Sequence, residues 1–447
     1  MGGIGAVAEP LVVIVLLFGG TWINRDFNPG RSRRPTHLRR ISDDVESGFG
    51  LVRSSRETFG VQDEEGDHRS SSPSLLPTQE PKYRTRTVNV LGRRKEVTTP
   101  NTRRFKGYFL SRLLERFPFL VECWYWALIY WVYQLGRAAT AVWIVEGTVF
   151  AARKHALQVI AAEEKLRIFF ELPIQEFFMR NEFMMTWINR IYSFIHIPGS
   201  IAFLVWLFYY TNTKNRIDER PKTTILTQTG GTPAGPRLYE ARRRTMALCN
   251  LLAFILFTVW PCMPPRLLSA DTTPDAAGKL ARSYGFVDTV HGPGGEGSIW
   301  TDNRFTNKFA AMPSLHFGYS LLIGVTIMTI PLDDTPSTSS TLPHLTKAHP
   351  NFIRTVRIPS WQRLGCILLG NLYPALILVA IIATANHFIL DAVAGAVVCG
   401  VAWWGNEILL NLLAVEDWFL WVVRIHKPES SFVDWEGDER DKRDSLT

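Results

Sequence analysis

Seven apolar runs divide the chain, and polar stretches of very different length separate them. The runs cover about residues 10–23, 119–142, 191–210, 246–262, 315–330, 364–385 and 389–413. Each approaches the roughly 20 residues that an α-helix needs to cross the hydrocarbon core of a bilayer. The pattern predicts an all-α membrane protein with a six-span helical core and an extra N-terminal transmembrane helix.

The first run has no basic residue before it, whereas Arg25, Arg31, Arg33 and Arg34 follow it closely. A secretory signal peptide normally carries positive charge ahead of its apolar region. We therefore expect residues 1–26 to be a transmembrane anchor rather than a cleaved signal peptide.

The polar stretches define the remaining organisation. Residues 27–105 are rich in Arg, Ser, Asp, Glu and Pro and contain few large apolar residues. Such a composition cannot bury enough surface to offset the entropy of ordering. The sequence predicts a disordered basic cytoplasmic loop over 27–105, a membrane domain over 106–423 and a charged cytoplasmic tail over 424–447.

One segment between the second and third runs, residues 153–190, mixes charges with apolar residues three and four positions apart. These apolar residues are Leu166, Phe169, Phe170, Ile174, Phe177 and Phe178. That spacing favours an amphipathic helix that lies along the membrane surface.

The net charge of +8 would suit a nucleic-acid partner, but no nucleic-acid-binding motif is present. The basic residues lie in polar segments between apolar runs, as expected for loops kept on the cytoplasmic side. If the loop after the first run is cytoplasmic, then 212–244, 332–363 and the tail are cytoplasmic too. The end of the fourth run, the start of the fifth and the sixth-to-seventh junction then share the opposite face.

Ionisable residues gather at those three places. Because an ionisable side chain at membrane depth is costly, its presence there indicates a function. His387 and Asp391 are four residues apart and would share one face of a helix that begins near Asn386. A carboxylate in that position can fix the tautomer of the ring and leave its other nitrogen free as a nucleophile.

The other two places offer groups that suit a phosphate. Ser314 and His316 stand where the fifth helix begins, and a helix N-terminus presents backbone NH groups to an anion. We expect Ser314, Arg266 and Lys308 to bind phosphate and His316 to act as a general acid.

Each of these residues alone could be an interfacial side chain, so the site hypothesis depends on their meeting on one predicted face. Three other histidines, His155, His196 and His291, show no partner pattern and are expected to be structural.

PSLH (Pro313 to His316) and HFILD (His387 to Asp391) resemble motifs of the superfamily of type 2 phosphatidic acid phosphatases and vanadium haloperoxidases. Leu315 in the second motif resembles the inositol phosphorylceramide synthase branch of this superfamily. Ile381 resembles that branch too, because it stands where the phosphatases carry Arg in the third motif. The first phosphatase motif is absent, and Asn386 stands where the synthases tend to carry a second His. The resemblance covers about residues 119–413.

The resemblance implies that His387 attacks phosphorus, Asp391 orients His387, and His316 protonates the leaving group, without a metal or cofactor. It implies a lipid phosphotransferase that moves a phosphoryl or phosphorylinositol group from a phospholipid donor to a ceramide-type acceptor. A lipid phosphate phosphatase that uses water and a non-catalytic membrane protein with a degenerate site are the alternatives. The expected location is an endomembrane, Golgi or endoplasmic reticulum, with a lumenal site and no nucleic-acid partner.

Overall fold

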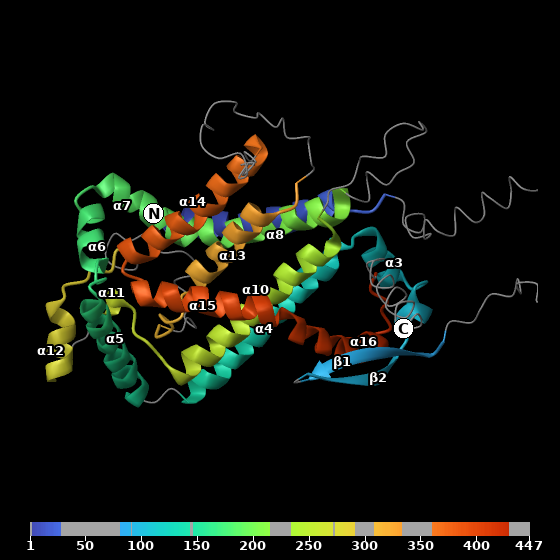
Figure 1. Cartoon of the computed structure of the whole chain (residues 1–447), viewed down its shortest axis with the longest axis horizontal. Coiled ribbons are helices and arrows are strands. Elements are labelled where there is room, and N and C mark those ends of the chain that lie inside the picture. Colours follow the sequence, from blue (N-terminus) through green and yellow to red (C-terminus); the bar gives the residue numbers. More distant parts are fainter. Residues whose placement is uncertain are drawn as a thin grey trace, which may run out of the picture. The chain divides into compact units, whose positions relative to one another are not determined.

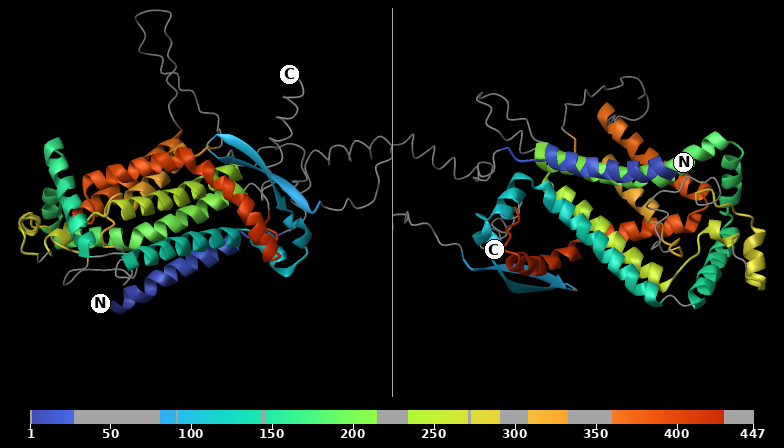
Figure 2. Two further views of the ribbon diagram at one scale, coloured as in Figure 1. Left: turned by 90° about the horizontal axis from the view of Figure 1, so that it is seen from below. Right: turned by 180° about the vertical axis from the view of Figure 1, so that it is seen from behind.

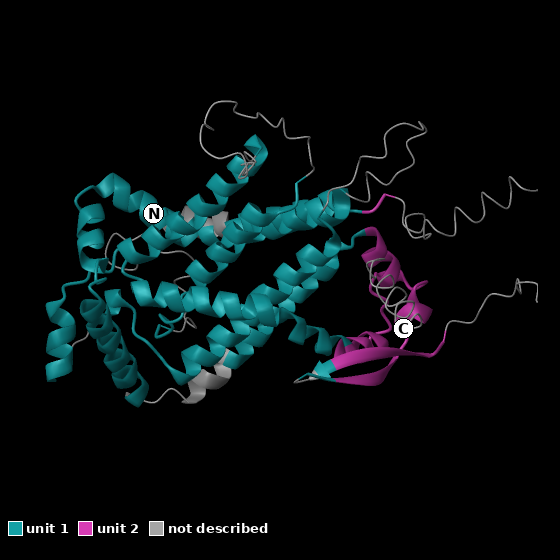
Figure 3. Ribbon diagram, in the orientation of Figure 1, with its two compact units in different colours: residues 1–25, 89–93, 117–413 teal, residues 26–88, 94–116, 414–447 magenta. Residues whose placement is uncertain are grey.

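The computed structural model describes residues 2–27, 81–90, 92–143, 146–214, 234–270, 273–290, 308–332 and 360–428 (Figure 1). These residues are mostly helical. They form two compact units, which Figure 3 colours separately. Unit 1 consists of residues 1–25, 89–93 and 117–413, and unit 2 of residues 26–88, 94–116 and 414–447.

The helices of unit 1 follow the predicted apolar runs and the segments between them. They are α1 (Gly2–Ile23), α4 (Phe119–Trp143), α5 (Glu146–Leu166), α6 (Glu171–Met179), α7 (Glu182–Arg190), α8 (His196–Phe208), α10 (Pro236–Val259), α11 (Pro265–Leu268), α12 (Ala276–Ser283), α13 (Leu315–Thr329), α14 (Trp361–Ala383) and α15 (Ile389–Gly405). Two π-helical segments, η2 (Ile191–Ile195) and η3 (Tyr209–Thr213), flank α8, and the 3₁₀ helix η4 (Asn406–Leu412) follows α15.

Two segments of the described chain are long and apolar enough to cross a membrane, Trp361–Ala383 and Ile389–Val422. A third candidate is the pair Glu182–Phe194 and His196–Thr213, which bends by 51° between its two parts. Pro10–Ile23 and Leu315–Thr329 are apolar but shorter. These helices are consistent with a membrane protein, and the six-span core with its extra anchor stays a prediction.

Helix α13 packs against both α14 and α15, and α1 runs alongside α8 (Figures 1 and 2). Close packing of α13 on α14 depends on two glycines. A Cβ atom added to Gly324 would lie 2.2 Å from the carbonyl oxygen of Gly370, and one added to Gly370 would lie 2.6 Å from that of Gly324. Small residues of this kind let helix backbones approach closely where lipid supplies no hydrophobic driving force.

The core of unit 1 lies where α4, α8, α10, α13 and α15 meet. Its largest fully buried side chains include Phe119, Leu207, Tyr239 and Leu322. An ion pair adds a polar connection between α4 and α10, since Nη1 of Arg243 donates to both carboxylate oxygens of Glu122 at 2.6 and 2.7 Å.

The amphipathic helix expected over residues 153–190 is instead parts of three helices, α5, α6 and α7. Helix α5 ends at Leu166, and the next residue, Arg167, has a φ of 59°, in the left-handed region. Asn181 begins α7, because its side chain accepts a hydrogen bond from the backbone NH of Met184 at 3.2 Å. Two local signals therefore interrupt a periodicity that reads as continuous in the sequence.

Unit 2 contains the strands β1 (Tyr83–Val90) and β2 (Arg93–Pro100), the 3₁₀ helix η1 (Thr102–Phe105), α3 (Phe109–Arg116) and most of α16 (Leu413–Val422). The disordered loop expected over 27–105 is therefore wrong for the hairpin and η1. Residues 28–80 lie outside the described residues, as do 429–447 of the expected tail.

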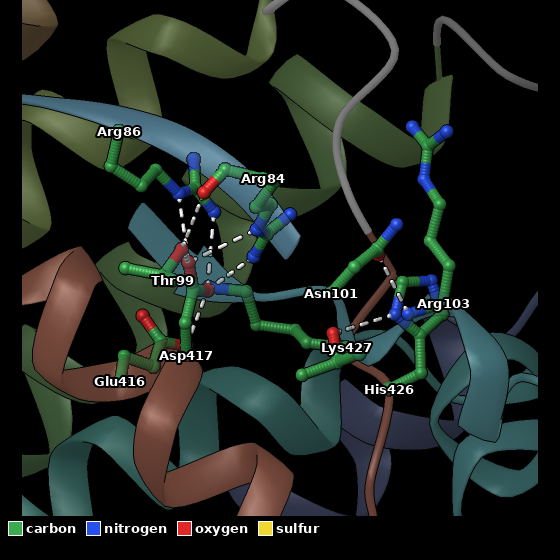
Figure 4. A network of polar contacts seen from close by, with 10 residues as sticks. Arg84, Arg86, Thr99, Asn101, Arg103, Glu416, Asp417, His426 and Lys427 are labelled. Atoms are coloured by element: carbon green, nitrogen blue, oxygen red, sulfur yellow. Dashed lines mark hydrogen bonds and ion pairs between the residues drawn. The ribbon is translucent and has the colours of Figure 1, made fainter. Parts of the chain in front are cut away.

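Polar contacts explain why this hairpin is ordered (Figure 4). The carboxylate of Asp417, 2% exposed, accepts hydrogen bonds from Nε of Arg84 and of Arg86, both at 3.0 Å, and from Oγ1 of Thr99 at 2.7 Å. Nδ1 of His426 lies 3.1 Å from Oγ1 of Thr102. A buried carboxylate with several charge-assisted partners stabilises a segment whose apolar content alone would not.

Candidate active site

Backbone pairing brings together two loops that are distant in sequence. The NH of Cys262 donates to the carbonyl of Phe309 at 2.8 Å, and the NH of Ala311 donates to the carbonyl of Cys262 at 3.1 Å. The segment after α10 thus pairs in parallel with the segment before α13. This pairing holds the loop that leads to Arg266 beside the loop that leads to His316.

The first turns of α13 and α15 are joined as well. The NH of Ser314 donates to the carbonyl of Asp391 at 2.9 Å, and Oγ of Ser314 accepts from the NH of Phe317 at 3.4 Å. Ser314 is fully buried and is the N-cap of α13. A Cβ atom added to Gly395 would lie only 2.2 Å from the carbonyl oxygen of Ser314, so this contact requires glycine.

The ring of His387 has a defined tautomer. Its Nδ1 lies 2.7 Å from the carbonyl oxygen of Ala311. A carbonyl can only accept, so Nδ1 carries the proton and Nε2 keeps its lone pair. His387 is only 5% exposed.

Asp391 lies beside this ring but is not its closest partner. Its Oδ2 is 3.5 Å from Nδ1 of His387 and accepts a hydrogen bond from the NH of Phe388 at 2.9 Å. Asp391 therefore closes the loop from His387 into α15, and its charge lies close to the protonated nitrogen of the ring.

His316 occupies the other side of the site, in contact with three rings. Its ring centroid lies 5.5 Å from that of His387, 4.9 Å from that of Tyr192 and 4.8 Å from that of His196. The spacing of His316 and His387 is on the scale of one phosphoryl group. The two histidines predicted to act together are thus neighbours.

Arg266 reaches the same region from α11. Its Nε donates to Oδ1 of Asn386 at 2.8 Å, and its Nη1 donates to Oδ2 of Asp288 at 2.8 Å. The NH of Arg266 also donates to the carbonyl of Ala385, a residue with a φ of 52°. Arg266 is therefore held next to His387 through Asn386, with part of its charge balanced by Asp288.

Lys308 stands apart from this group. It is exposed, and among the described residues no hydrogen bond or ion pair joins it to either histidine. A role in phosphate binding for Lys308 and for Ser314 stays a prediction.

The structure adds residues that sequence reasoning missed. His196, expected to be structural, contacts His316 and lies 3.3 Å from the hydroxyl of Tyr373 through its Nδ1. His155 instead stacks on Trp260, and His291 lies outside the described residues.

Glu163 and Glu171, on α5 and α6, reach the start of α15. These two glutamates lie far from the motifs along the chain, so a single sequence does not indicate that they reach the site.

A groove opens beside the site, between α6 and α14, with a volume of about 470 Å³. Its lining is apolar and consists of Phe170, Pro173, Ile174, Phe177, Phe178, Leu378, Val379, Ile382 and Ile389. Ile389 is the first residue of α15 and follows His387 by two positions. The groove therefore includes the first residue of α15, two positions after His387.

Comparison with known proteins agrees with this geometry. The family model described as the PAP2 superfamily matches residues 223–336 and 353–405, which include His316, His387 and Asp391. The match covers less than half of the chain and is a similarity of these residues to the PAP2 superfamily. It suggests lipid phosphatase or phosphotransferase activity, and it does not distinguish the inositol phosphorylceramide synthase branch. No curated protein and no solved structure matches the chain.

Proposed function

We propose that the protein is an integral-membrane lipid phosphotransferase with His387 as its nucleophile. The observation that carries this proposal is the 2.7 Å contact between Nδ1 of His387 and the carbonyl of Ala311. That contact leaves Nε2 unprotonated, as nucleophilic attack on phosphorus requires.

The reaction proceeds in two balanced steps. Nε2 of His387 attacks the phosphorus of a phospholipid, a P–N bond forms, and the bond from phosphorus to the leaving oxygen breaks. His316 gives its proton to that oxygen. The hydroxyl of the acceptor then attacks the phosphohistidine, returns a proton to His316 and releases His387.

Two surrounding groups support the same chemistry. The negative charge of Asp391 stabilises positive charge on the ring of His387 as the P–N bond forms. Arg266, beside Asn386, supplies a cation for the phosphoryl oxygens.

Burial favours a lipid alcohol, such as a ceramide-type acceptor, over water. His387 is 5% exposed, His196 6% and Tyr192 8%. A closed site of this kind excludes water from a reactive intermediate. The apolar groove at Ile389 suits an acyl chain of the donor lipid. An endomembrane location with a lumenal site belongs to this proposal.

The test uses the purified full-length protein in detergent with a radiolabelled phospholipid and a ceramide-type alcohol. Transfer of label to the alcohol, with an acid-labile phosphohistidine mapped to His387 after rapid quenching, is the expected result. Release of free phosphate without added alcohol would instead make the protein a lipid phosphate phosphatase. Label absent from His387, or full activity in His387→Ala, would overturn the mechanism.

A further inference from the structure

The first backbone NH groups of α15 are occupied by carboxylates from three helices. The NH of Leu390 donates to Oε1 of Glu163 on α5 at 2.7 Å, and the NH of Ile389 donates to Oε1 of Glu171 on α6 at 2.8 Å. Asp391 accepts from the NH of Phe388. The segment that follows His387 is thus held from two neighbouring helices as well as from within.

Both glutamates are fully buried, and within the described residues neither forms an ion pair with a cation. Their second oxygens, Oε2 of Glu163 and Oε2 of Glu171, have no hydrogen-bond partner among the described residues. Two buried carboxylates side by side would repel one another strongly, so one of them must be protonated.

The surrounding charges agree with a shared proton. Burial, the hydrogen bond to Glu171 and the charge of Glu171 together raise the pKa of Glu163 from its ordinary 4.5 to about 9. The charge of Asp391 on α15 acts in the same direction, and Cys262, in the loop after α10, also faces Glu163. At neutral pH Glu163 therefore keeps its proton.

We propose that Glu163 and Glu171 form a carboxylic acid–carboxylate pair that clamps the start of α15 and positions His387 for attack. This proposal rests on the proposed function, since it assumes that His387 is the nucleophile. Each glutamate uses Oε1 for a backbone NH of α15, which leaves its buried Oε2 to take part in sharing the proton of the pair. Both are positioning residues, because they act through the backbone next to His387 and not on the substrate.

Hydrogen-bond chemistry gives this clamp a distinctive response to substitution. In Glu163→Gln the amide oxygen still accepts from Leu390 and the amide nitrogen donates to Glu171, as the protonated acid does. Glu171→Gln works in the mirror-image way. In the double Gln variant both amide oxygens are committed to α15, so two NH₂ groups face one another with no acceptor.

The experiment measures the rate of phosphohistidine formation by rapid quenching in the full-length protein. Each single Gln variant should stay within about threefold of the wild type, whereas the double variant should lose at least about tenfold, because small misplacement of a nucleophile costs that much. KM for the lipid should change little. Glu164→Gln/Glu176→Gln removes two exposed carboxyls from the same two helices and is the matched control.

Equal rates in the double variant and the wild type would overturn the clamp. If the double variant does not fold, the pH profile of activity in Glu163→Gln tests the clamp instead. The wild type should lose activity as the pair loses its proton near pH 9, whereas Glu163→Gln should not. An unchanged alkaline limb in Glu163→Gln contradicts the proposal. Activity that survives His387→Ala would instead contradict the proposed function. Failure of the clamp and failure of the proposed function are therefore distinguishable.

Discussion

The carbonyl oxygen of Ala311 lies 2.7 Å from Nδ1 of His387, so a backbone group 76 positions away in sequence sets the tautomer of the proposed nucleophile. Ala311 is itself held by the carbonyl of Cys262. The geometry of the ring therefore depends on the pairing of two loops, and Asp391 has a largely electrostatic role.

Replacement of Asp391 by Asn should reduce turnover by about 10- to 100-fold, far less than the roughly 10⁴-fold that a wrong tautomer costs a serine-protease triad. Asn keeps an oxygen for the NH of Phe388, and Ala311 still accepts from His387. Asp391→Ala should lose more activity and about 1 kcal/mol of stability, because it also removes the carboxylate that accepts a hydrogen bond from the NH of Phe388, the N-cap residue of α15. Steady-state rates and thermal unfolding in detergent measure both. A loss in Asp391→Asn as complete as in His387→Ala would show that the carboxylate sets the tautomer.

His316→Gln tests the general acid through the leaving group. With a lipid ester, whose alkoxide leaves poorly, we expect a loss of roughly 10²–10⁴-fold. With a nitrophenyl ester, whose phenolate needs no proton, the loss should be about tenfold or less. The ratio of the two rates in variant and wild type is the measurement. Equal losses on both esters would assign His316 to binding rather than to proton transfer.

The apolar groove between α6 and α14 offers a test of acyl-chain binding. Val379 lines the groove and is 37% exposed, so Val379→Trp should fill it without disturbing the core. We expect KM for a long-chain lipid to rise about tenfold, as one or two kcal/mol of apolar contact is lost. KM for a short-chain ester should not change. Leu368→Trp, exposed on the same helix outside the groove, is the control. An equal effect on short and long chains would exclude the groove as the acyl site.

Much of unit 1 could be predicted because helix-forming apolar runs leave a strong mark on a sequence. The sixth run, predicted over 364–385, is α14 (Trp361–Ala383), and the fifth is α13 with Ser314 as its cap. The juxtaposition of His316 and His387 followed from topology and from motif spacing. These features depend on local composition and on short motifs, which a single chain displays.

The parts that were not predicted depend on contacts between distant positions. The hairpin at Tyr83–Pro100 is ordered by Asp417, more than 300 positions later, so its polar composition reads as disorder. Glu163, Glu171 and His196 reach the site across helix packing that no local pattern encodes. The break at Arg167 is a backbone conformation that its residue type disfavours, and periodicity alone does not reveal it.

Gly395→Ala should destabilise the protein and impair catalysis together. The added Cβ would meet the carbonyl oxygen of Ser314 at 2.2 Å, and backbone cannot move aside as a flexible side chain can. Helices α13 and α15 must separate, which displaces His316 from His387. We expect a loss of about 1–3 kcal/mol, and a fall in turnover measured in the same detergent sample. Gly400→Ala on the same helix has open space around its Cβ and should behave as the wild type. Equal stability and turnover in Gly395→Ala and Gly400→Ala would contradict the close contact between Gly395 and Ser314.

The pH dependence of stability should reveal the proton of the Glu163–Glu171 pair. The pKa of Glu163 rises from an ordinary value of 4.5 to about 9 in the fold, mainly through burial. Between those values the folded chain keeps a proton that the unfolded chain has released. The free energy of unfolding contributed by this group is therefore fully present below pH 4.5 and is lost as the pH rises through about 9. Thermal unfolding in detergent should show a steeper decline with pH in the wild type than in Glu163→Gln, which has no proton to lose. Glu164→Gln, at an exposed neighbouring position, should keep the slope of the wild type, and parallel curves for the wild type and Glu163→Gln would mean that the pair is not protonated.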